Sequence, residues 1–108
     1  FQVGAADGCE AWEACRSVCG DIAAVDINMG CNKHSAVAGG HGTALCSDPD
    51  KTRDVIKTLT RNLPLGCAVT AKVRLQSTSA QTLELCRGLE AMGASAVTVH
   101  ARTASQGP

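Results

Sequence analysis

Residues 68–75 read AVTAKVRL, and their side chains alternate between apolar and polar along the segment. Because neighbouring residues of a β-strand point to opposite faces, this alternation predicts a strand with two chemically different faces. The apolar face carries Val69, Ala71 and Val73, and the polar face carries Thr70, Lys72 and Arg74. We expect helices to cover the apolar face. Two cations on the other face are unfavourable unless polar or anionic groups meet them, and an edge strand with a solvated charged face is the alternative.

Helix signals flank this strand on both sides. Asp48 as N-cap, followed by Pro49, predicts a helix that ends before Pro64 and Gly66. Thr78 or Ser79 is expected to cap the next helix, which ends at Gly93. The buried stripe expected of that helix is Leu83, Cys86, Leu89 and Met92. The remaining segments are a strand end at 1–3, a helix from Asp7 to about Val18, a strand over 22–29, a glycine-rich loop with one or two helical turns over 38–46, a strand over 94–100, and a polar tail over 101–108.

Strands that alternate with helices in this way predict a parallel sheet with right-handed crossovers. A doubly wound sheet would carry a glycine-rich phosphate loop after its first strand, but VGAAD at 3–7 lacks the G-x-G-x-x-G spacing. The other architecture is the (β/α)8 barrel, which normally needs about 250 residues. We therefore expect an α/β fold that is a partial (β/α)8 TIM barrel with about four consecutive β/α units.

The composition limits the domain organisation and the partners. The chain has 108 residues, ten basic and ten acidic, and its only aromatic side chains are Phe1 and Trp12. This balance gives no bulk electrostatic reason to expect nucleic acid or an anionic membrane, and no apolar run is long enough to span a bilayer. Because the chain starts at Phe1 without a leader, we expect residues 1–108 to be a fragment of one catalytic domain, with no second domain.

Seven cysteines are present, at positions 9, 15, 19, 31, 46, 67 and 86. Their number is odd and no C-x-x-C occurs, so neither a disulfide framework nor a zinc site is indicated. We expect reduced, buried packing residues and no metal, as in a cytoplasmic protein, with a mitochondrial location as the alternative.

Polar residues recur at or near the carboxyl ends of the four predicted strands. They are Gln2, Asn28, Cys31, Lys72, Arg74 and His100. In barrels of this kind the chemistry lies where the strands end, so their convergence predicts a polar pocket.

Several motifs in this order resemble the flavin-dependent tRNA-dihydrouridine synthases, most closely the eukaryotic class that acts on uridine 20 of the D-loop. The motifs are FQVG (1–4), DINMGC (26–31), GGHGTAL (39–45) followed by SDPDK (47–51), TAKVR (70–74) and VTVHAR (97–102). The resemblance implies an FMN-containing barrel, here strands three to six, that reduces the C5=C6 bond of a tRNA uridine with NADPH.

The resemblance also implies a role for each polar residue. Cys31 would be the general acid that protonates C5 while hydride from the reduced flavin reaches C6, and a thiol suits this role because it can give up its proton near neutral pH. Asn28 and Arg74 would contact the uracil, which must leave the tRNA stack. Gln2, Lys72 and His100 would bind the flavin. tRNA is the expected partner, without a membrane or a metal, and the oligomeric state stays open.

Two positions depart from the family's usual motifs. Asn32 follows Cys31 where a proline is usual, so we expect a freer loop around the thiol. Ala101 stands between His100 and Arg102 where a glycine is usual. Two alternatives remain open: another FMN-dependent pyrimidine oxidoreductase, of the dihydroorotate or dihydropyrimidine dehydrogenase kind, or a non-catalytic RNA-binding barrel fragment.

Overall fold

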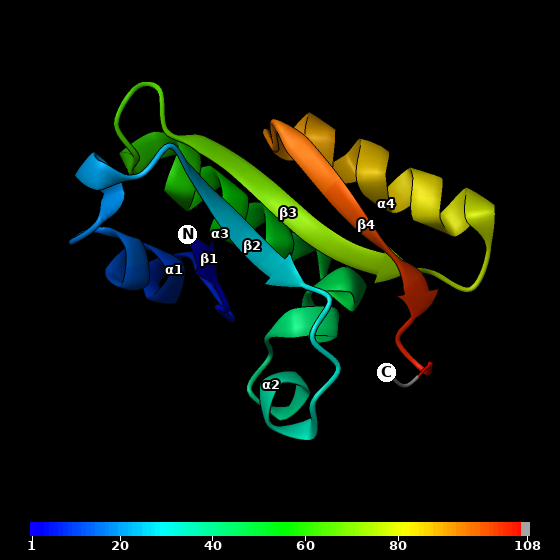
Figure 1. Cartoon of the computed structure of the whole chain (residues 1–108). Helices are drawn as coiled ribbons and strands as arrows, with labels where there is room; N and C mark the ends of the chain where they lie inside the picture. The colour runs from blue at the N-terminus through cyan, green and yellow to red at the C-terminus, as the bar shows by residue number, and fades with distance from the viewer. Residues whose placement is uncertain (107–108) are drawn as a thin grey trace.

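The computed structural model describes residues 1–106, and it contains one parallel sheet of four strands in the order β1-β2-β3-β4 (Figure 1). The strands are β1 (Gln2–Val3), β2 (Ala24–Met29), β3 (Ala68–Leu75) and β4 (Ala96–Thr103). The helices are α1 (Gly8–Cys15), α2 (His34–Ala38), α3 (Pro49–Asn62) and α4 (Ser79–Met92), with 3-10 turns η1 (Cys19–Asp21) and η2 (Gly42–Ser47).

Each strand pairs in parallel with the next strand along the chain. Such a sequential order belongs to a segment of a (β/α)8 barrel, whereas a doubly wound sheet reverses its strand order at a switch point. The predicted α/β fold with four consecutive strands of a parallel sheet is therefore confirmed. The assignment to strands three to six of a full barrel stays a prediction.

The two faces of the sheet differ as the alternation in β3 predicts. Side chains on one face of β2 and β3 are buried, and this set is Val25, Ile27, Met29, Val69, Ala71 and Val73. In Figure 1, helices α3 and α4 lie behind this part of the sheet, while no helix covers the front face. α3 contributes Val55, Ile56 and Leu59 to the same core. The uncovered front face, called the inner face below, carries the polar side chains.

The predicted helix caps are present. The Asp48 carboxylate accepts a hydrogen bond from the backbone N–H of Lys51 at 3.1 Å, which begins α3. Thr78 rather than Ser79 caps α4, in a reciprocal capping box with Gln81. These side chains satisfy backbone donors that have no partner inside a first helical turn.

Several element boundaries differ from the prediction. α1 ends at Cys15 rather than near Val18, because exposed residues follow Cys15 and give the helix no further apolar stripe to bury. α2 was not expected. β4 continues to Thr103, because a register shift after Arg74 pairs Leu75 with Thr103 and lets the strand run on past His100. The predicted polar tail thus begins inside β4, and its residues 107–108 lie outside the described residues.

The cysteine prediction is partly wrong. All seven thiols are free, but Cys15 is buried, Cys9 is exposed, and the other five are half-buried. Leu83, expected in the buried stripe of α4, is 50% exposed, and Leu85 packs against the core instead. The reason is that α4 covers only the part of the sheet formed by β3 and β4, so part of the apolar surface of α4 has no neighbour.

Within residues 1–106, no helix is long and apolar enough to cross a membrane. No cluster of three or more His, Cys, Asp or Glu residues there could hold a metal ion.

The separation of the two faces can be tested by matched alanine substitutions. Ile27→Ala removes a fully buried side chain and should lower the free energy of unfolding by about 2–5 kcal/mol. Thr98→Ala, on the exposed inner face of β4, should change it by no more than about 0.5 kcal/mol. Urea unfolding of the full-length protein measures both, and equal losses would contradict the assignment of the faces.

Candidate active site

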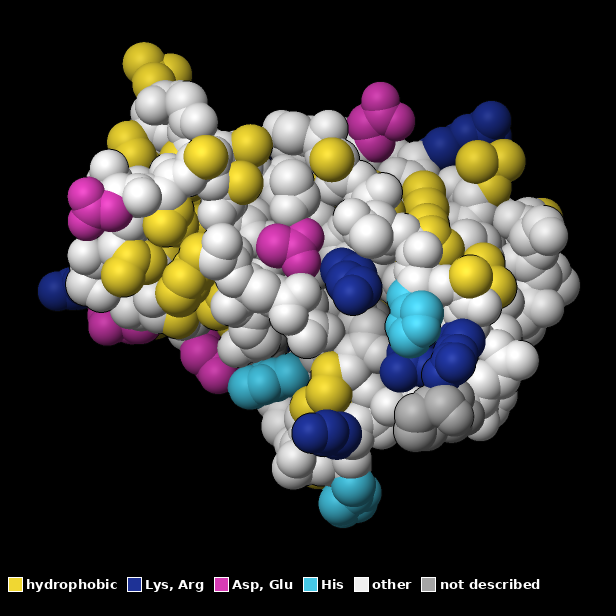
Figure 2. Space-filling view, viewed as in Figure 1, with side chains coloured by type: hydrophobic (Ala, Val, Ile, Leu, Met, Phe, Trp, Pro, Cys, Tyr) yellow, Lys and Arg dark blue, Asp and Glu magenta, His cyan; other side chains and the backbone are white. Residues whose placement is uncertain are grey.

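The structure places five of the six predicted site residues on the inner face of the sheet. Gln2 lies on β1, Asn28 on β2, Lys72 and Arg74 on β3, and His100 on β4. The strand register sets Asn28 beside Lys72 and Arg74 beside His100. Figure 2, in the same view as Figure 1, shows basic and histidine side chains gathered on this face toward the carboxyl ends of the strands.

Cys31 lies in the loop after β2, and hydrogen bonds fix the backbone of that loop. The Asn28 side-chain oxygen accepts from the N–H groups of Gly30 and Cys31, both at 3.0 Å. The carbonyl of Cys31 accepts from the N–H of Thr43 at 2.9 Å. The backbone on both sides of the thiol is therefore held, which favours a defined position for the sulfur.

Gly42 lets two parts of this loop approach each other. It has φ +59°, and a Cβ added there would overlap the carbonyl oxygen of Cys31 and lie 3.0 Å from its Cβ. Both the backbone conformation and the contact exclude a side chain. The glycine-rich loop is recognisable in the sequence, but this contact with Cys31 has no local sequence signal.

Arg74 ties three segments of backbone together. Its Nε donates to the carbonyl of Gly30 at 2.6 Å, and its Nη1 donates to the carbonyls of Thr103 at 3.1 Å and Gln106 at 3.3 Å. The side chain thus links the end of β2 to the end of β4. The contact of Arg74 with uracil stays a prediction, and its hydrogen bonds to distant backbone have no signal in the local sequence.

Asn32 has a structural partner that the sequence did not indicate. Its side-chain nitrogen donates to the carbonyl of Ala104 at 2.7 Å. We expected a freer loop in the absence of proline, but this bond ties the loop to the segment after β4. This long-range hydrogen bond is a restraint on the loop, and the expectation of a freer loop stays a prediction.

Lys72 is exposed on the inner face, and among residues 1–106 its ammonium group makes no hydrogen bond or ion pair. An unpaired cation beside Asn28 and Thr98 can meet an anionic or carbonyl-rich ligand without losing a protein partner. This donor set fits the pyrimidine ring of a reduced flavin, which carries negative charge.

The pKa of His100 is lowered from its ordinary value of 6.5. The first cause is the partial loss of hydration of its half-buried ring, followed by the positive charges of Arg74, Arg102 and Lys72. The imidazole is therefore neutral near neutral pH, and it can both donate and accept a hydrogen bond.

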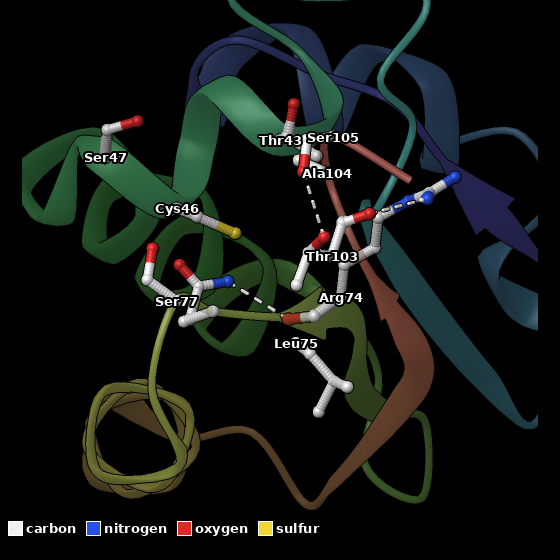
Figure 3. A pocket seen from close by; sticks show the side chains of 10 residues that line it. Thr43, Cys46, Ser47, Arg74, Leu75, Ser77, Thr103, Ala104 and Ser105 are labelled. Carbon is white, nitrogen blue, oxygen red and sulfur yellow. Dashed lines mark hydrogen bonds between the residues drawn. The ribbon is translucent and has the colours of Figure 1, made fainter. Parts of the chain in front are cut away.

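A pocket of about 440 Å³ lies among the loops at the ends of β3 and β4 (Figure 3). Its lining consists of Thr43, Cys46, Ser47, Arg74, Leu75, Gln76, Ser77, Thr103, Ala104 and Ser105. Of the six predicted site residues only Arg74 lines it, so the predicted site is the open inner face rather than this pocket. Cys46 donates its thiol proton to the carbonyl of Met29, and burial raises the pKa of this thiol to about 11. Cys46 is thus a protonated packing residue.

The sequence model of the family described as dihydrouridine synthase (Dus) matches residues 1–108. The chain belongs to the dihydrouridine synthase family. This match favours a dihydrouridine synthase over an enzyme of the dihydroorotate or dihydropyrimidine dehydrogenase kind.

Three relatives from this family are similar over most of the chain. The tRNA-dihydrouridine(20) synthase (NAD(P)+) of Saccharomyces cerevisiae is 38% identical over 104 residues, which are 94% of this chain and 27% of the yeast protein. The protein of the same name from Schizosaccharomyces pombe is 35% identical over 105 residues, which are 95% of this chain and 22% of that protein. The human tRNA-dihydrouridine(20a/20b) synthase-like protein is 36% identical over 95 residues, 87% of this chain and 30% of its own length. The chain thus spans less than a third of each of these dihydrouridine synthases.

The close approach at Gly42 predicts opposite effects for two glycine substitutions. Gly42→Ala places a side chain at positive φ and against the Cys31 carbonyl, so it should destabilise the fold by at least about 1–2 kcal/mol. Gly88→Ala, on α4 with open space around the new methyl group, should stabilise the fold by about 0.5–1 kcal/mol. Thermal unfolding of the full-length protein measures both, and a neutral Gly42→Ala would contradict the contact.

The neighbours of His100 predict its titration in the folded protein. Its NMR-monitored pKa should lie below 6.5, and Arg102→Gln should move the pKa upward by removing one nearby charge. Because the folded state binds this proton less tightly than the unfolded chain, folding loses stability as the pH falls through and below about 6.5. A pKa of His100 at or above 6.5 in the folded protein would contradict this arrangement of positive charges around the imidazole.

Proposed function

We propose that the protein is a tRNA-dihydrouridine synthase that reduces the C5=C6 bond of a D-loop uridine, with FMN as cofactor and NADPH as reductant. Its family membership supports the reaction class. The observation that carries the proposal is the shared inner face, to which four strands contribute polar residues and to which Asn28 and Arg74 join the loop of Cys31 by hydrogen bonds.

The flavin would lie against the residues that have binding capacity left. Lys72 offers an ammonium that has no partner within residues 1–106, His100 a neutral imidazole, and Gln2 the second hydrogen of its amide nitrogen. When bound, the reduced flavin would supply hydride for C6 of the base. A positive charge beside its pyrimidine ring favours the anionic reduced form, which is the contribution assigned to Lys72.

The uracil would lie between that face and the Cys31 loop. Asn28 holds the backbone of the loop with its oxygen and would contact a uracil carbonyl with its amide N–H. The Cys31 thiol would donate its proton to C5 as hydride reaches C6, and the resulting thiolate would regain a proton from water. Arg74 would contact the base through Nη2, since its Nε and Nη1 hold loop carbonyls.

The role of Cys31 is tested by comparing two Cys→Ala variants of the full-length protein. Cys31→Ala should lower the rate of dihydrouridine formation in an unmodified tRNA transcript by about 100- to 10,000-fold, the usual contribution of a general acid. Cys9→Ala, which changes an exposed thiol on α1, should leave the rate unchanged. Mass spectrometry of the tRNA measures the product, and the flavin absorbance checks cofactor content.

Other outcomes decide against parts of the proposal. Unchanged dihydrouridine content with Cys31→Ala would remove the general-acid role. Turnover of free uracil instead of tRNA would favour another pyrimidine oxidoreductase. No turnover by the flavin-loaded wild-type protein, together with retained tRNA binding, would favour the non-catalytic RNA-binding module.

A further inference from the structure

The inner face carries a chain of hydrogen bonds that crosses three strands, and its centre is a carboxylate outside the predicted site residues. Asp26 on β2 accepts from the Thr70 hydroxyl of β3 at 2.7 Å with Oδ1. It accepts from the Gln2 side-chain nitrogen of β1 at 2.8 Å with Oδ2. Both carboxylate oxygens of Asp26 are thus engaged by neighbours on either side.

The hydrogen bonds continue from Gln2 toward the loop of Cys31. The Gln2 oxygen accepts from the Asn28 side-chain nitrogen at 3.3 Å. The Asn28 oxygen in turn accepts from the N–H groups of Gly30 and Cys31. A continuous path of hydrogen bonds therefore joins the Asp26 carboxylate to the backbone of Cys31.

The groups at the two ends of this path fix which atom donates and which accepts in each hydrogen bond along it. A carboxylate can only accept hydrogen bonds, and backbone N–H groups can only donate them. If the amide of Gln2 turned over, its oxygen would face the Asp26 carboxylate and its nitrogen would face the nitrogen of Asn28. Both contacts would be repulsive, so each amide has one favoured orientation.

This order of donors and acceptors decides what the site can offer to a ligand. The oxygen of Asn28 already accepts two backbone hydrogen bonds, so its remaining capacity is an N–H. Gln2 likewise keeps one N–H on its side-chain nitrogen. Both residues therefore present hydrogen-bond donors, which match the carbonyl oxygens of a pyrimidine or an isoalloxazine ring.

We propose that Asp26 is a positioning residue, whose carboxylate orients the amide of Gln2 toward carbonyl-bearing ligands and, through the Gln2 oxygen and Asn28, supports the loop of Cys31. The proposal rests on the proposed function for its effect on turnover. The proposal assigns Asp26 no proton transfer: its carboxylate acts by accepting the hydrogen bonds from Thr70 and Gln2.

A purely structural role for Asp26 is the competing explanation, and Asp54 provides the matched control. Asp54 on α3 accepts a hydrogen bond from the backbone N–H of Gly8 at 2.8 Å. Helix α3 lies on the opposite side of the sheet from the inner face (Figure 1). Asp54→Ala removes a hydrogen-bonded carboxylate that joins two elements, but it leaves the inner face intact.

The experiment compares Asp26→Ala, Asp26→Asn and Asp54→Ala in the full-length holoenzyme. The measured quantity is the single-turnover rate at which an unmodified tRNA transcript oxidises the prereduced flavin. Asp26→Ala should slow this step by about 10- to 100-fold, the loss typical of misplaced reacting groups. Asp26→Asn should restore most of the rate, since an amide oxygen can still accept from Gln2 and its nitrogen can donate to the Thr70 hydroxyl. Asp54→Ala should keep the wild-type rate.

Three results would overturn the proposal. The first is a wild-type rate with Asp26→Ala. The second is a loss with Asp26→Asn as large as with Asp26→Ala, because the charge would then act directly. The third is a loss of rate with Asp54→Ala as large as the loss with Asp26→Ala when both variants show the same drop in melting temperature. The rate would then depend on stability alone.

A second readout separates this proposal from the proposed function. Crystal structures of the wild-type protein and the Asp26→Ala variant should differ in the position of the Gln2 side chain, because Asp26 accepts the hydrogen bond from its nitrogen. This difference is expected whether or not tRNA is turned over. An unchanged Gln2 side chain would overturn the positioning role. Inactivity of the flavin-loaded wild-type protein toward tRNA, with a displaced Gln2 side chain in the variant, would instead remove the proposed function and keep the positioning role.

Discussion

The site depends on the period-two alternation of side chains along β2 and β3. Val25, Ile27 and Met29 are buried under the helices, so the residues between them must point to the inner face. A shift of one residue in β2 would bury Asp26 and Asn28 in the apolar core, and the same shift in β3 would bury Lys72 and Arg74. The burial of the core therefore fixes the chemistry of the opposite face, and the parallel register then places polar side chains of neighbouring strands side by side.

The inner face alone does not position the thiol, because Cys31 lies beyond the end of β2. Hydrogen bonds from distant segments hold this loop: Arg74 binds the Gly30 carbonyl, and Asn32 binds the Ala104 carbonyl. Polar side chains at and after the strand ends thus bind loop backbone. This use explains why Arg74, predicted from the sequence as a substrate contact, makes three hydrogen bonds to backbone carbonyls.

Sequence reasoning could predict the features that depend on local patterns. Alternation in β3, the cap at Asp48 and the motifs of the family led to the parallel sheet and to one shared polar face. It could not predict contacts between residues far apart in the chain, such as Gly42 against Cys31 or Asn32 with Ala104, because these depend on how the loops meet in space. The alternation of side chains along β2 places Asp26 on the same face as Asn28. Its partners Gln2 and Thr70 depend on the strand register, which the sequence alone does not give.

The central claim is that the inner face of this sheet binds the flavin beside the Cys31 loop. The most direct test is the distance between Lys72 Nζ and the nearest flavin atom in an experimental structure of the full-length protein with FMN bound. The account predicts a hydrogen-bond distance of about 2.7–3.2 Å to a nitrogen or oxygen of the pyrimidine ring. A flavin bound away from this face, or a Lys72 side chain packed against the helices, would contradict it.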